Sequence, residues 1–239
     1  MFSVFTQDAA EYGPSMDTNP GSRLPARPGL TVDRDPFLRR WIVSVTLAEA
    51  AGFAIPAAAG GILNLLAAPP GVVYPAMVLA GSCEGALLGF GQSIGFGRAV
   101  PRWTWVLATA AGAAVAWSIG MLPGSLGGID FGSPWAIVFT AVLGCLLLLS
   151  IPTLQWSVLR RHGPQAAFWI PVNAGAWAAG ILWTLAPSPF IDERTPAPVV
   201  FSVYVVAGLL MAATVAVLTG FAARRIASES ARYAPPPRR

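Results

Sequence analysis

The stretch VVYPAMVLAGSCEGALLGFGQSIGFGR, residues 72–98, decides the fold. Between residues 72 and 96 it contains one charged side chain, Glu84, and it is long enough to cross a hydrocarbon core of about 30 Å as a helix. Gly81, Gln92 and Arg98 stand in it at relative positions 0, 11 and 17. The stretch predicts a helix that spans a membrane.

The same spacing occurs two more times in the chain. The later copies are Gly144, Gln155 and Arg161, and then Gly208, Thr219 and Arg225. The first two copies extend to Pro101 and Gly112, which match Pro164 and Gly175. Regular recurrence of this kind predicts an architecture built from repeated helices.

The composition favours a membrane protein. Hydrophobic residues make up 55% of the 239 residues and charged residues only 11%, with a mean hydropathy of +0.61. A soluble domain is about one quarter charged, so this chain lacks the surface that water requires. All fifteen basic residues are Arg, and the wealth of Ala, Gly and Pro suggests a bacterial source.

Six apolar segments are each long enough to cross a bilayer. They are residues 41–66, 72–96, 103–121, 135–159, 168–185 and 199–223. Prolines at the first turn mark most of the predicted helix starts. These are Pro36, Pro101, Pro134, Pro164 and Pro198. We therefore expect an all-α, integral-membrane bundle of six helices over residues 36–226.

Polar segments flank this bundle. Residues 1–35 are rich in Pro, Gly and Asp and contain no apolar run typical of a signal peptide, so they predict a disordered N-terminal tail. Residues 227–239 predict a disordered C-terminal tail. Fourteen of the fifteen arginines fall in these tails, at the helix ends that adjoin them (residues 39–40 and 224–225), or in the loops at 98–102 and 160–161. By the positive-inside rule both termini are cytoplasmic, in a bacterial plasma membrane.

The repeat contains two helices, so its copies run parallel. Residues 72–121 form one unit and residues 135–186 the next, while the helix at 199–223 begins a third unit. Pairing of this last helix with the first one would complete a pseudo-threefold bundle. Trp41, Trp103, Trp105 and Trp156 lie near the arginine-rich loops, where an aromatic belt at the membrane interface is expected.

Glycines predict where the helices touch. Gly81, Gly85 and Gly89 form overlapping small-xxx-small motifs, which allow another helix to approach closely. Gly144 and Gly208, at the repeat positions of Gly81, are expected to pack in the same way.

Polar side chains within the spans are the candidate site. Glu84 shares the glycine face, and Glu49 lies in the first helix. Gln92, Gln155, Asn173 and Thr219 are expected to form a polar layer nearer the cytoplasm, with the two acids above it. An acid within a membrane span is a candidate functional residue, so this site could bind a proton, a cation or a small polar solute. In the alternative, purely structural interpretation, both carboxyls are protonated and bond to Gln and Asn across helices.

Enzyme chemistry is not indicated. Ser and Thr lack a His and Asp to complete a hydrolytic triad, and the single histidine, His162, lies beside Arg160 and Arg161. We find no glycine-rich phosphate loop and no metal-ligand cluster, so no cofactor or metal is expected. The basic loops suit lipid head groups rather than nucleic acid.

Three strings carry a resemblance to known sequences: Glu49-x-x-Gly52-Phe53-x-x-Pro56-Ala57, Glu84-Gly85-x-x-Leu88-Gly89-x-x-Gln92 and Gln155-Trp156-x-x-Leu159-Arg160. Over residues 40–185 the chain resembles a group of uncharacterised, largely actinobacterial multi-pass membrane proteins. The resemblance implies a membrane location and fold, and no activity.

Two functions follow as hypotheses. The first is a non-enzymatic membrane protein that binds or conducts a small solute or ion through a polar cavity, and so serves transport. The second is a structural or accessory subunit of a larger membrane complex, or of a homo-oligomer.

Overall fold

The computed structural model describes residues 35–125, 127–128, 132–162, 164–192 and 194–233. All of them belong to one compact unit, Val32–Arg239. Of the tails expected at 1–35 and 227–239, residues 1–34 and 234–239 lie outside the described residues.

Six long helices make up this unit. They are α1 (Pro36–Leu65), α2 (Pro70–Phe96), α3 (Arg102–Ser125), α4 (Pro134–Leu159), α5 (Trp169–Leu185) and α6 (Ala197–Tyr233). Three short 3-10 helices connect them: η2 (Arg160–His162), η3 (Pro164–Phe168) and η4 (Ser188–Phe190). Six helices are long and apolar enough to cross a membrane, which indicates a multi-pass membrane protein.

Proline and capping residues set the helix starts. The carboxylate of Asp35 accepts hydrogen bonds from the backbone amides of Phe37 and Leu38, at 2.9 and 3.2 Å, and Pro36 occupies the first helical position. Asp35 also meets Arg224 of α6, with Oδ2 2.7 Å from Nη1. The pKa of the Asp35 carboxyl is lowered from its ordinary value of 3.8, chiefly because Arg224 hydrogen-bonds it.

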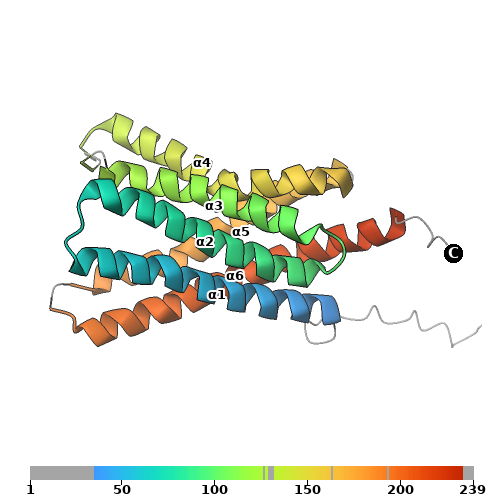
Figure 1. Ribbon diagram of the computed structural model, residues 1–239, viewed down its shortest axis with the longest axis horizontal. Coiled ribbons are helices and arrows are strands. Elements are labelled where there is room, and N and C mark those ends of the chain that lie inside the picture. The colour runs from blue at the N-terminus through green and yellow to red at the C-terminus, as the bar shows by residue number, and fades with distance from the viewer. Residues whose placement is uncertain (1–34, 126, 129–131, 163, 193, 234–239) are drawn as a thin grey trace, which may run out of the picture. The chain divides into compact units, whose positions relative to one another are not determined.

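The six helices form a closed ring. Each packs against its neighbours in chain order, and α6 packs against α1 (Figure 1). One end of the ring carries the arginines that flank the helices, and we call it the arginine end. There Arg40 of α1 donates to the backbone oxygen of Gly95 of α2 at 2.8 Å, and Arg224 meets Asp35.

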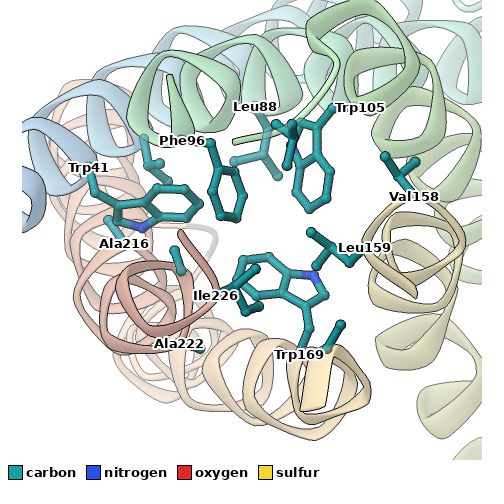
Figure 2. Packing of buried hydrophobic residues seen from close by; sticks show 14 residues of the cluster. Trp41, Leu88, Phe96, Trp105, Val158, Leu159, Trp169, Ala216, Ala222 and Ile226 are labelled. Atoms are coloured by element: carbon teal, nitrogen blue, oxygen red, sulfur yellow. The ribbon is translucent and has the colours of Figure 1, made fainter. Parts of the chain in front are cut away.

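Aromatic side chains fill the interior at the arginine end. Trp41, Phe96, Trp105 and Trp169 point into the space that the helices surround (Figure 2), and we call these four the aromatic cluster. Neighbouring rings meet mostly edge to face, with centroids 4.7–6.1 Å apart. Such pairs contribute about 0.5–1.5 kcal/mol beyond the area they bury.

Two sequence expectations are wrong here. Trp41 and Trp105 are fully buried in this cluster instead of facing the membrane interface, whereas Trp103 is 69% exposed as a belt residue should be. The last helix also continues to Tyr233, so the predicted C-terminal tail does not begin at residue 227. Its extra turns carry an ion pair one turn apart, Arg225 with Glu229 at 3.3 Å, which supports a helix beyond the apolar segment.

Candidate intramembrane binding site

A cavity of about 340 Å³ lies inside the ring and is lined by all six helices. Apolar side chains form most of its wall, among them Leu88 of α2, Leu147 and Ile151 of α4, and Met211 of α6. Two acids, Glu49 of α1 and Glu84 of α2, complete it. A volume of this size matches that of small-molecule pockets.

Glu84 reaches the cavity because it shares the glycine face of α2. Its residue is 7% exposed, so the side chain lies inward, as the glycine pattern predicts. Trp117 of α3 donates its indole Nε1–H to Glu84 Oε2 at 2.8 Å. The sequence interpretation looked to other helices for a partner and did not identify Trp117.

Glu49 is the least satisfied polar group of the cavity. It is fully buried, and apart from the neighbouring carboxyl of Glu84 neither of its oxygens has a hydrogen-bond partner within the described part of the chain. The Glu49 carboxyl lies beside the Glu84 carboxyl. Gly52, also on α1, packs closely against the backbone of Glu84. Two neighbouring carboxyls disfavour the state in which both are ionised unless a cation joins them.

Aromatic rings line the cavity together with the acids. Phe53 of α1, Trp117 of α3 and Trp177 of α5 line the cavity. Trp177 Nε1 is buried, and among the described residues nothing accepts its proton. None of the residues recorded as lining the cavity is an Arg, Lys or His.

The predicted polar layer lies on the arginine side of the acids, since Gln92 follows Glu84 by eight residues, or about 12 Å along α2. Gln155 Nε2 donates to Gln92 Oε1 at 2.7 Å and to Thr109 Oγ1 at 2.9 Å. Asn173 Nδ2 donates to Gln155 Oε1 at 3.4 Å. The structure therefore brings Gln92, Gln155 and Asn173 together, and adds Thr109.

The three tryptophans of the aromatic cluster hydrogen-bond to polar residues of the repeated spacing from the arginine end. Each indole N–H donates to one polar residue of the repeated spacing: Trp105 to Gln92 at 3.0 Å, Trp169 to Gln155 at 2.8 Å, and Trp41 to Thr219 at 3.2 Å. Thr219 is thus buried beside the layer without a direct bond to its amides. The acids make no hydrogen bond to the layer in the described chain, contrary to the structural interpretation of Glu49 and Glu84.

The glycines separate into packed and open positions. A Cβ on Gly81 would meet the Trp117 ring, and one on Gly85 would meet Ala113 Cβ. On Gly89 it would lie 2.8 Å from Thr109 Cβ, and on Gly208 3.6 Å from Phe53. Gly144 is exposed and a Cβ there would meet nothing within 4 Å, so the expectation that Gly144 packs on a neighbouring helix is wrong for this chain.

The chemistry available to the cavity is that of its lining side chains. The described residues contain no group of three or more His, Cys, Asp or Glu placed to hold a metal ion. The cavity offers two buried carboxyls, the Trp177 indole N–H, which has no acceptor among the described residues, and an apolar wall. These groups can hold a small molecule in a fixed orientation.

No family model matches the sequence. No curated protein and no solved structure is significantly similar to the chain.

Proposed function

We propose that this protein binds a small solute in the intramembrane cavity and moves it across, or presents it within, the membrane. The observation that carries the proposal is Glu49, a fully buried carboxyl that lines the cavity and whose only partner among the described residues is a second acid, Glu84. An unpartnered polar group in a membrane costs several kcal/mol, so a solute that pairs with it gains a strong contact.

The repeat adds support for a binding site on a central axis. In each two-helix unit an indole N–H meets the middle residue of the repeated spacing, and the third pair joins α6 to α1 through Thr219 and Trp41. We propose that three parallel hairpins surround the cavity as a pseudo-threefold bundle.

The arginine end is proposed to face the cytoplasm. The support is the concentration of arginine in the tails and in the loops at 98–102 and 160–161, because short basic loops are retained inside. Cysteine labelling from outside the cell should reach residues 121–134 and 186–198 and spare residues 98–102. The reverse pattern would refute this orientation.

Filling the cavity tests the binding proposal. Ala116 is buried on the cavity wall, whereas Ala111 on the same helix is exposed on the outer face. Protein purified in a native lipid environment is extracted, and small molecules that co-purify are measured by mass spectrometry. We expect a solute with the parent and with Ala111→Phe, and its loss with Ala116→Phe. Equal solute content in all three refutes the proposal.

A role as an accessory subunit is the second candidate, and α4 favours it. Only 11% of the apolar window of α4 is buried, the lowest share of the six helices, and its Gly144 is open. Small residues on an exposed membrane helix allow another helix to approach. Cross-linking from a cysteine at Gly144 should then capture a partner subunit or a second copy, and capture of neither refutes this role.

A further inference from the structure

The carboxyl of Glu49 sets the sign of charge that the cavity can accept. Both of its oxygens are acceptors when ionised, and Glu84 Oε2 already receives the Trp117 N–H. Without a basic side chain among the lining residues, no positive charge of the protein reaches these acids. A bound cation supplies the missing countercharge, whereas an anion would be repelled.

The remaining wall does not suit Ca²⁺ or a sugar. Ca²⁺ takes six to eight oxygen ligands, but apart from the two acids the only side-chain oxygen on the wall belongs to Thr184. A sugar would leave most of its hydroxyls unpaired against Leu147, Ile151 and Met211, which is costly in an apolar pocket. An alkyl chain would fill the space but leave Glu49 without a countercharge.

The aromatic rings match a cation that carries apolar substituents. Phe53, Trp117 and Trp177 line the cavity together with the acids. The faces of such rings attract ammonium groups, most strongly where water is excluded, as in the aromatic cages that recognise quaternary ammonium ligands. A cavity of about 340 Å³ has room for a small organic body beside its charge.

We infer that the ligand is an organic ammonium cation with an apolar body, whose charge pairs with Glu49 and Glu84 while its body contacts the Trp177 side of the cavity. This inference rests on the proposed binding function and narrows it to one chemical class.

Equilibrium dialysis of a probe and its neutral isostere tests the inference. The full chain in phosphatidylcholine nanodiscs is dialysed against labelled benzyltrimethylammonium or against neopentylbenzene, with empty nanodiscs as the blank. We expect saturable retention of the cation by the parent, and at least about tenfold weaker binding of the neutral isostere, since bonds to charged groups are worth about 1.5–3 kcal/mol, or roughly 10- to 100-fold.

Matched variants locate the binding. Glu49→Gln should weaken cation binding at least about tenfold, while Glu229→Gln near the end of α6, outside the cavity lining, should leave it unchanged. Trp177→Leu should weaken it about three- to tenfold, unlike Trp135→Leu at a position that is 79% exposed. If Glu49→Gln fails to fold, the ammonium inference is still tested by whether the parent binds the cation more tightly than the neutral isostere.

The outcomes separate the two proposals. Equal retention of both probes, unchanged by Glu49→Gln, overturns the ammonium inference but leaves solute binding in the cavity intact. Retention of neither probe above empty nanodiscs also overturns the ammonium inference. In that case the proposed function is judged separately by the comparison of Ala116→Phe with Ala111→Phe.

Discussion

Replacement of Gln155, at the centre of the polar layer, by Leu should lower the free energy of unfolding of the protein. Gln155 is fully buried and takes part in four hydrogen bonds between side chains. Leu has a similar volume, so the change removes the bonds without opening a large cavity. Thr109 keeps its bond to the Trp105 carbonyl at 2.9 Å, whereas Trp169 Nε1 and the Asn173 amide lose their recorded partners.

The magnitude follows from these losses. Hydrogen bonds between helices in a membrane average about 0.6 kcal/mol and reach about 1.7 kcal/mol. A buried donor left without an acceptor costs about 1–3 kcal/mol. The two bonds that Gln155 donates account for about 1.2 kcal/mol and the two orphaned donors for about 2–6 kcal/mol, so we expect Gln155→Leu to lower the free energy of unfolding by about 3–7 kcal/mol.

SDS unfolding in mixed micelles, followed by circular dichroism, measures this difference. Ser157→Leu on the same helix is the control, because Ser157 is exposed and bonds only to the Leu154 carbonyl of its own helix. It should stay within about 0.5 kcal/mol of the parent. Trp169→Phe removes the orphaned donor, so the double variant should lose less than the sum of the two singles. A loss for Gln155→Leu no greater than that of the control would refute the reasoning.

Three further comparisons test packing, charge and the Glu84 contact by the same unfolding measurement. Gly85→Ala should cost about 1–3 kcal/mol because its Cβ meets a neighbouring helix, whereas Gly144→Ala should be neutral or stabilising, and equal effects would contradict the packing. Asp35→Asn keeps the cap but loses the Arg224 ion pair, so the parent should be about 0.2–1 kcal/mol more stable. Folding lowers the pKa of Asp35, so the stability advantage of the parent over Asp35→Asn is present above pH 3.8 and is lost as the pH falls through the lowered pKa. A stability advantage that grows in acid would refute the pairing. Glu84→Gln retains an oxygen for the indole N–H and should match the parent, while Glu84→Leu should lose about 1–3 kcal/mol; equal stability of the two variants would show that this bond contributes nothing.

Helix positions were largely predictable because bilayer thickness and proline act locally. The apolar run at 135–159 and Pro134 gave the bounds of α4 to within one residue. The extension of α6 to Tyr233 was missed because hydropathy marks where a helix leaves the membrane, and helix formers such as Ala and Arg continue beyond it.

The inward polar residues were also predictable, but their partners were not. The glycine face placed Glu84 and Gln92 inside, because small residues mark the packed side of a membrane helix. Trp41, Trp105 and Trp169 were missed as donors, since a Trp near a helix end is equally suited to the lipid interface. Their even separation of 64 residues, close to the 63 residues between Gln92 and Gln155, was the signal that could have identified them.

The spacing that related Gly144 to Gly81 did not predict its surroundings. Equal position along two helices does not fix equal rotation toward a neighbour. Gly81 faces Trp117, but Gly144 lies on the outer side of a helix that is mostly exposed. Register alone could not distinguish these cases.

The bond between Trp41 and Thr219 joins residues 178 positions apart, and this separation imposes an order on biosynthesis. At roughly 5–20 residues per second, a ribosome needs roughly 10–35 s to deliver Thr219 after Trp41 has been made. During that interval the first helix waits in the membrane with its indole N–H lacking this acceptor. The ring therefore closes only after the last helix has been synthesised, and a nascent chain truncated before α6 cannot reach the native assembly.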